Sequence, residues 1–198
     1  MYADKYLNKK SRGNLIVISG PSGVGKGSIR QALLERCSEI AYSVSATTRS
    51  PRNGERNGKE YFFHNNEEFE HMISDDMFLE WAKVYENYYG TPSGFVERTI
   101  SAGFDCILEI DVQGAMQVKM KKPEGIFIFI APPSKEELVN RIKGRGTEND
   151  HEIIKRMNNV DAEMAVIKSY NYVVVNKSLA DAVELIYCII MAERARIK

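Results

Sequence analysis

The chain has few cysteines and no long apolar run. Its three cysteines, Cys37, Cys106 and Cys188, are odd in number and widely spaced, which does not suit a disulfide framework. We therefore expect reduced cysteines in a cytoplasmic protein. The longest apolar stretches, such as residues 185–192, are shorter than the roughly 20 residues that cross a bilayer. Residues 1–13 lack the apolar segment of a signal peptide and are predicted to be a polar tail.

An excess of charge of one sign is also missing. Lys+Arg and Asp+Glu each number 27, so no overall field attracts nucleic acid or a membrane surface. We therefore expect neither as a partner. The three histidines, at positions 64, 71 and 151, have no metal-ligand spacing. With 198 residues, no internal repeat and no low-complexity linker, the chain fits one domain with a sizeable core.

A glycine-rich stretch, residues 14–34, is the feature around which the rest is organised. Residues 15–19 are a short apolar run typical of a strand buried on both faces, and the residues after Lys26 have helical apolar spacing. In a loop between them, backbone N–H groups and the helix N-terminus suit an anion. This context favours a P-loop for a nucleoside triphosphate over an ordinary glycine-rich turn. Its residues are Gly20, Pro21, Ser22, Gly23, Val24, Gly25, Lys26, Gly27 and Ser28.

The loop departs from the standard P-loop pattern at one position. A Ser or Thr usually follows the lysine and ligates Mg²⁺, but this chain has Gly27 there and Ser28 next. Because Mg²⁺ usually keeps several waters, binding mainly through substrate phosphates and water tolerates the change. We therefore expect Mg²⁺ as cofactor, with Ser28, Glu109 and Asp111 as the candidate protein ligands.

Two segments after the first helix carry candidate binding residues. Residues 45–59 form a basic, turn-rich loop in which Pro51 keeps Arg49 and Arg52 on an extended backbone, so both guanidinium groups can converge on one ligand. A solvated loop with scattered charge is the alternative. Residues 87–92 are expected to form a tight turn that carries two tyrosines.

Between these two segments, residues 78–85 alternate as a strand does. This pattern places Glu80 on the same face as Phe78, Ala82 and Val84. A carboxylate in apolar surroundings is costly unless another group donates a hydrogen bond to it. The alternative is a surface glutamate on a half-exposed strand.

Glu109 and Asp111 end the next predicted buried strand, residues 105–111. They are two residues apart, so they share a face at the carboxyl end of the strand, where ligands bind in open α/β sheets. Beside a P-loop, such carboxylates suit Mg²⁺ and its waters. The alternative is an acidic strand end in which Asp111 caps the following helix.

Arg141 and Arg145 are four residues apart at the end of a predicted helix, where like charges repel. Crowded beside glycines, they suggest a mobile flap that closes on an anion. Glu137, which could neutralise Arg141, supports a surface alternative. Arg156 follows near the start of a long helix, and a final core strand ends at Asn176.

Along nearly its whole length the chain resembles a guanylate kinase. The order and spacing of six stretches carry the resemblance: GPSGVGKG, SVSATTRSPRNGERNGKEYFF, FLEWAKVYENYYGTP, ILEIDVQG, RIKGRGTE and VVVN. It implies a three-layer α/β P-loop kinase fold around a central parallel sheet. The implied regions are a core of residues 14–44, 92–140 and 157–198, a GMP-binding region of residues 45–91 and a lid of residues 141–156.

The resemblance also implies the reaction and its residues. ATP and GMP, or dGMP, would give ADP and the diphosphate by Mg²⁺-dependent in-line transfer, in a monomer or a homodimer. Lys26, Arg141, Arg145 and Arg156 would be catalytic, and Asn176 would join the P-loop in binding ATP. The implied GMP-binding residues are Ser45, Arg49, Arg52, Tyr61, Glu80, Tyr89, Thr91, Glu109 and Asp111. Thr91 stands where serine is frequent, but it keeps the hydroxyl.

Two other functional classes fit the sequence less well. A GTPase switch fits the D-x-x-G pattern at residues 111–114, but Leu179 lacks the carboxylate of N-K-x-D and Gly27 lacks the magnesium hydroxyl. A non-catalytic guanylate-kinase-like module that binds phosphorylated partners has no reason to keep Lys26 and the lid arginines. We therefore expect a kinase.

Overall fold

The computed structural model describes residues 12–84, 86–143 and 150–197, apart from the side chains of residues 150–156 and 158. Its central sheet has five parallel strands in the order β2-β7-β1-β8-β9. These are β1 (Leu15–Ser19), β2 (Ile40–Tyr42), β7 (Asp105–Glu109), β8 (Ile126–Ala131) and β9 (Tyr172–Val175). The strands β1 and β8 are buried along their whole length, as expected for parallel strands covered on both faces.

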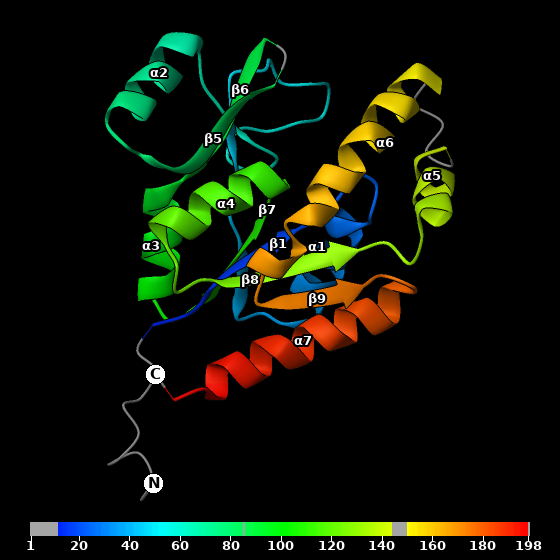
Figure 1. Cartoon of the computed structure of the whole chain (residues 1–198). Coiled ribbons are helices and arrows are strands. Elements are labelled where there is room, and N and C mark those ends of the chain that lie inside the picture. The colour runs from blue at the N-terminus through cyan, green and yellow to red at the C-terminus, as the bar shows by residue number, and fades with distance from the viewer. Residues whose placement is uncertain (1–11, 85, 144–149, 198) are drawn as a thin grey trace, which may run out of the picture.

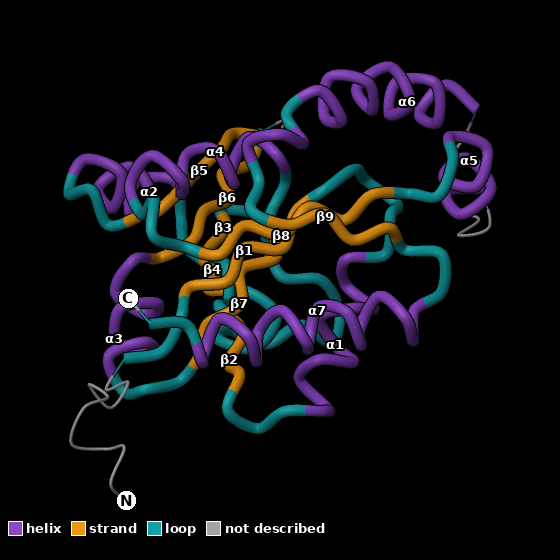
Figure 2. Tube along the Cα trace, turned by 60° about the horizontal axis from the view of Figure 1, so that its bottom comes forward, coloured by secondary structure: helices purple, strands orange, loops and turns teal. Residues whose placement is uncertain are grey.

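Helices cover both faces of this sheet, which confirms the predicted three-layer α/β fold. On one face Ile16 and Ile18 pack against α1 (Lys26–Arg36) and α7 (Leu179–Ala195). On the other face Leu15 and Val17 pack against α3 (Ser93–Ser101) and α4 (Val112–Lys121). Figure 2 shows α1 and α7 on one side of the strands and α4 on the other. The alternation follows from the two-residue period of a strand.

A second, four-stranded sheet, in the order β4-β3-β6-β5, lies beside α4 (Figure 1). It contains β3 (Ala46–Thr47), β4 (Phe62–Phe63), β5 (Phe78–Val84) and β6 (Asn87–Pro92), with α2 (Asn66–Ser74) packed on it. Phe69 of α2 stacks on Phe78 with ring centroids 4.4 Å apart, which forms a small separate core.

The second sheet corrects two predictions. Residues 87–92 are strand β6 rather than a tight turn, and β3 lies within the segment predicted to be a loop. Ala46 of the distant β3 pairs with Gly90, and Gly90 pairs with Trp81 of the neighbouring β5, so β6 is held extended between two strands. Strand pairing of this kind overrides local turn preference.

The remaining helices are α5 (Lys135–Lys143), α6 (Asp150–Ala165) and the short η2 (Ile167–Ser169). Three helix starts carry side chains that accept from the first turn. The side chains of Asn65 and Ser178 accept from backbone N–H groups at the starts of α2 and α7, and Ser134 Oγ accepts from the N–H of Glu137. These contacts satisfy N–H groups that a helix start leaves without partners.

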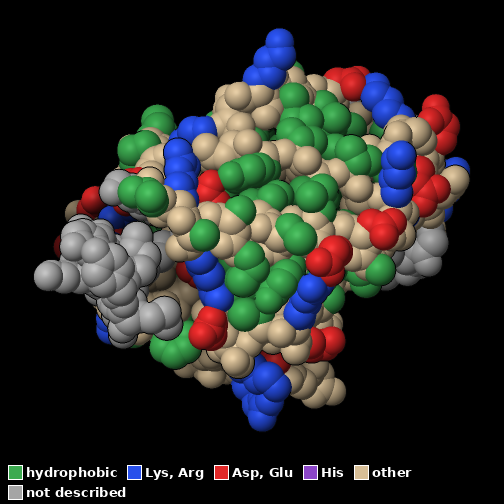
Figure 3. All heavy atoms as spheres, turned by 90° about the horizontal axis from the view of Figure 1, so that it is seen from below, with side chains coloured by type: hydrophobic (Ala, Val, Ile, Leu, Met, Phe, Trp, Pro, Cys, Tyr) green, Lys and Arg blue, Asp and Glu red, His purple; other side chains and the backbone are tan. Residues whose placement is uncertain are grey.

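The face around α7 is rich in apolar side chains (Figure 3). Exposed apolar residues of β9 and α7 are Val173, Val175, Leu179 and Leu185. Within the described ranges, no helix combines the length and the apolar character that a membrane span requires.

Candidate functional site

The P-loop lies between the carboxyl end of β1 and the start of α1. Gly25 has φ 100° at the N-cap of α1, and a Cβ there would stand 2.7 Å from Nδ2 of Asn176. Only glycine adopts this conformation without strain and leaves room for that amide. Lys26 Nζ donates to the backbone oxygens of Gly20 at 2.6 Å and Pro21 at 3.1 Å. The ammonium group therefore lies over its own loop, where an anion would bind.

Asn176 connects this loop to α5. Its side-chain amide donates to the backbone oxygen of Val24 at 2.8 Å, and its own backbone oxygen accepts from Arg141 at 3.0 Å. Arg141 also bonds Glu137 at 3.0 Å, as the surface alternative expects. Arg141, which is predicted to be in the lid, is thus bonded to Asn176 just after β9, and Asn176 in turn contacts the P-loop.

A basic and aromatic cluster forms where the loop of residues 48–61 meets β6. Tyr61 and Tyr89 make an edge-on pair with ring centroids 6.0 Å apart, and the Arg49 guanidinium lies 5.5 Å from the centre of the Tyr61 ring. Glu55 accepts from Arg49 at 2.9 and 3.0 Å, and its second oxygen accepts from the N–H of Arg52 at 2.7 Å. A carboxylate thus occupies Nη2 of Arg49, where the charge also suits a phosphate oxygen.

Glu80 is buried, with 8% of its surface exposed, which rules out the surface alternative. Thr91 lies opposite it on β6 and donates its hydroxyl to Oε1 at 2.5 Å. Burial raises the pKa of the Glu80 carboxyl to about 7, with a further contribution from the negative charge of Asp111. The hydrogen bond from Thr91 opposes this shift. The result is a desolvated carboxylate held by Thr91.

The prediction that Glu80 shares an apolar face with Phe78, Ala82 and Val84 is wrong in part. An irregularity in β5 between Phe78 and Glu80 breaks the simple alternation, so Leu79 is buried as well. Val84, predicted to lie on the same face as Glu80, is 43% exposed. Glu80 instead lies against α4, where a Cβ at Gly114 would stand 2.8 Å from its Oε2.

Glu109 and Asp111 have different partners. Glu109 Oε2 accepts from Arg30 of α1 at 2.7 Å, and a Cβ at Gly27 would lie 3.5 Å from its Oε1. Asp111 is the N-cap of α4 and accepts from the N–H of Gly114 at 2.8 Å, so the capping alternative is confirmed. Glu109 therefore borders the P-loop, whereas Asp111 borders Glu80.

The predicted residues thus fall into three groups. The loop groups Lys26 with Asn176 and Arg141, the second sheet groups Arg49 with Tyr61 and Tyr89, and the acidic group joins Glu80 with Thr91 and Asp111. Ser45 precedes β3, and Ser28 is exposed on α1. Arg145 lies outside the described residues. Arg156 belongs to α6, and its side chain lies outside the described part.

Sequence reasoning missed four residues of this site. Glu55, Arg30 and Gly114 contact predicted residues directly, and Tyr42 packs its ring 4.3 Å from the Arg30 guanidinium. Burial raises the pKa of Tyr42 to about 12. The spacing R-x-x-R-x-x-E from Arg49 to Glu55 is a signal that could have pointed to Glu55, but no local pattern marks the others.

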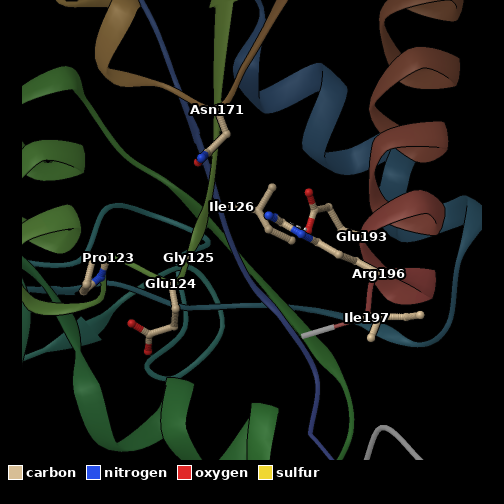
Figure 4. A pocket seen from close by; sticks show the side chains of 8 residues that line it. All are labelled: Pro123, Glu124, Gly125, Ile126, Asn171, Glu193, Arg196 and Ile197. Atoms are coloured by element: carbon tan, nitrogen blue, oxygen red, sulfur yellow. Dashed lines mark ion pairs between the residues drawn. The ribbon is translucent and has the colours of Figure 1, made fainter. Parts of the chain in front are cut away.

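A separate cavity of about 390 Å³ lies at the amino end of β8, next to the end of α7 (Figure 4). Glu193 and Arg196, which line it, form an ion pair at 3.5 Å, and Glu193 also accepts from the Tyr172 hydroxyl at 2.5 Å. Ligands of open α/β sheets bind at the opposite, carboxyl edge. This cavity is therefore not the candidate active site.

Comparison with known proteins identifies the family. A family model described as guanylate kinase matches residues 12–193. The guanylate kinase of Caldanaerobacter subterraneus subsp. tengcongensis is 57% identical over 191 residues, which cover 96% of this chain and 93% of that protein. The guanylate kinase of Bacillus subtilis is 53% identical over 94% of this chain and 92% of its own length.

A solved structure gives the same result. The crystal structure of guanylate kinase from Anaplasma phagocytophilum superposes with a TM-score of 0.74 at 34% identity, and the match covers 94% of this chain and 89% of that one. The chain belongs to the guanylate kinase family.

Proposed function

We propose that this chain is a guanylate kinase, an ATP:GMP phosphotransferase that converts ATP and GMP to ADP and GDP. The observation that carries the choice of acceptor is the buried Glu80 carboxylate, hydrogen-bonded by Thr91 at 2.5 Å and bordered by Asp111. Guanine presents two adjacent donors, N1–H and the exocyclic amino group, and an ionised carboxylate accepts both. Adenine presents an acceptor at N1, which leaves the carboxylate without its match.

The phosphate groups have their own partners in this proposal. The P-loop and Lys26 hold the phosphates of ATP, and Arg49, Arg52, Tyr61 and Tyr89 hold the phosphate of GMP. Glu55 releases Arg49 when that phosphate arrives, because both anions need the same Nη2 group of the guanidinium. Ser45 is assigned to the same phosphate from the resemblance alone.

Mg²⁺ fits the residues at Gly27. The Glu109 carboxylate lies beside the position of the missing side chain, where a Cβ would be 3.5 Å from Oε1, and carboxylate oxygens suit Mg²⁺ and its waters. Among the described residues no group of three His, Cys, Asp or Glu side chains is placed to hold a metal ion. Bound through the phosphates, Mg²⁺ would neutralise charge on the transferring group. Arg30 keeps the Glu109 carboxylate oriented through its bond at 2.7 Å.

Phosphoryl transfer then requires positioning and charge neutralisation, because the acceptor is already an anionic phosphate oxygen. We assign these tasks to Lys26, Arg141, Arg145 and Arg156. Residues 45–91 form the GMP-binding region and residues 141–156 the lid, and closure of both excludes water that would otherwise accept the phosphoryl group. Cytoplasmic location, use of dGMP and a monomeric or homodimeric state stay predictions.

A coupled assay of ADP formation tests the proposal. ATP is supplied with GMP, AMP, CMP or UMP, and Lys26→Ala serves as the inactive control. We expect turnover with GMP at a kcat/KM well above that of the other monophosphates. A GTPase would release phosphate from GTP without an acceptor, and a non-catalytic module would bind GMP without turnover. Either result would contradict the proposal.

A further inference from the structure

Gly114 lies between the two carboxylates of the base site. It is the third residue of α4, and its N–H donates to Oδ1 of Asp111 at 2.8 Å. A Cβ at this position would stand 2.8 Å from Oε2 of Glu80 and 3.2 Å from its carboxyl carbon. The same glycine therefore holds one carboxylate by its backbone and makes room for the other by its lack of a side chain.

The strand that carries Glu80 is fixed to the same face of α4. The Gln117 side chain accepts from the N–H of Trp81 at 3.2 Å and donates to the oxygen of Trp81 at 3.1 Å. Lys121 donates to the backbone oxygen of Phe78 at 2.7 Å. These bonds lie on both sides of Glu80, so the backbone of β5 cannot move away from α4 without breaking them. A side chain at position 114 would displace the Glu80 carboxylate instead.

We propose that Gly114 is a positioning residue for base selection, because its bare backbone lets the Glu80 carboxylate rest on the first turn of α4 beside Asp111. The inference rests on the proposed function, in which Glu80 reads guanine. The first turn of a helix carries partial positive charge, so this location also favours the ionised carboxylate that guanine requires.

A purely structural role for this glycine predicts a different result. Gly114 has no left-handed backbone conformation, so alanine fits its φ angle, and alanine stabilises a helix interior relative to glycine. If Gly114 were only a helix residue, Gly114→Ala would keep or raise stability and leave substrate choice unchanged. A steric role instead predicts a stable protein with altered choice of base. The atoms that the new methyl group would meet are the carboxyl end of the flexible Glu80 side chain.

The test compares Gly114→Ala with Gly94→Ala. Gly94 is exposed in the first turn of α3, and a Cβ there would meet only the end of the Arg98 side chain, at 3.3 Å. We expect both variants to unfold at or above the wild-type temperature. Gly114→Ala should raise KM for GMP about tenfold and lower the GMP-to-AMP ratio of kcat/KM about tenfold, because a shift of a reacting or binding group by less than 1 Å has effects of this size. KM for ATP and the kinetics of Gly94→Ala should not change.

A double-mutant cycle separates positioning from general damage. In a Glu80→Gln background, Gly114→Ala should no longer change the GMP-to-AMP ratio, because the carboxylate that it displaces is absent. An unchanged ratio in Gly114→Ala, or the same tenfold fall in the Glu80→Gln background, would overturn the inference. A Gly114→Ala protein that does not fold would also overturn the inference, because the added methyl group would then have disrupted the backbone instead of displacing the Glu80 carboxylate. If Glu80→Gln itself leaves the ratio unchanged, the assignment of Glu80 in the proposed function fails first.

Discussion

The choice of base should depend on pH through Glu80. Burial raises the pKa of this carboxyl to about 7, so it titrates in the range where enzymes are commonly assayed. Guanine needs the ionised form, which accepts from two donors. A protonated carboxyl presents a donor of its own and suits the N1 acceptor of adenine better. The KM for GMP should therefore fall as the pH rises, and AMP should be relatively better at low pH.

The size of the effect follows from the pKa. With a pKa of about 7, the ionised fraction is about one-tenth at pH 6 and about nine-tenths at pH 8. The KM for GMP should fall roughly tenfold over this range if only the ionised form binds. In Glu80→Gln the KM should be high throughout and lack this dependence, because the amide does not titrate.

The assay is initial-rate kinetics with saturating ATP at pH 6, 7 and 8, with GMP and AMP as acceptors. The phosphate group titrates with a second pKa near 6 in both acceptors, so the ratio of their kcat/KM values cancels that contribution. We expect a ratio that rises about tenfold in the wild type and stays flat in Glu80→Gln. A flat ratio in the wild type, or an equal rise in the variant, would refute the reasoning.

The same carboxyl should affect stability with a defined sign. Because its pKa is raised on folding, the folded chain holds the proton more tightly than the unfolded chain. Its stabilising contribution is complete below the unfolded pKa of 4.5 and is lost as the pH rises to about 7. At about 1.4 kcal/mol per pKa unit, the loss is roughly 3 kcal/mol. The test is urea unfolding at pH 4.5 and 7.5. Between these two pH values, the free energy of unfolding of Glu80→Gln should rise relative to that of the wild type by up to this amount.

Three further substitutions test other parts of the molecule. Lys26→Ala should lower kcat at least about 10²-fold in the coupled assay, with the thermal midpoint nearly unchanged. Arg141→Ala should lower kcat by about 10³-fold or more, as the loss of an arginine finger does. Asp105→Ala should lower the free energy of unfolding by roughly 3 kcal/mol in urea, because Asp105 is buried and accepts from Arg194 and from the N–H of Asn14, both at 2.6 Å.

Each of these substitutions has an outcome that contradicts it. Near-normal turnover in Lys26→Ala would remove the P-loop from catalysis. An unchanged kcat in Arg141→Ala would leave only its observed bonds to Glu137 and Asn176, a structural role. If Asp105→Ala changes stability by less than about 0.5 kcal/mol, the Arg194 contact contributes no more than a surface ion pair does.

The sequence by itself determined the features that depend on neighbouring residues. A run of buried-strand residues, a glycine loop and an amphipathic pattern predict β1, the P-loop and α1, because each signal lies within about one turn or one strand. Helix starts at Asn65 and Ser178 follow from side chains three residues from their partners. The roles of individual site residues came from the resemblance, since no local pattern states what a side chain will contact.

Only the tertiary structure decided which surfaces meet. The sequence allowed Glu80 to be a half-exposed residue or one on an apolar face of its own strand. The structure instead places it against Gly114 of α4. Residues 87–92 are predicted to be a turn because tyrosine, glycine and proline cluster there. Pairing with β5 and β3 makes them a strand. Contacts such as Glu80 with Gly114 and Ala46 with Gly90 join residues far apart in the chain and carry no local signature. Their energies come from burial and strand pairing, which depend on the whole fold rather than on the sequence nearby.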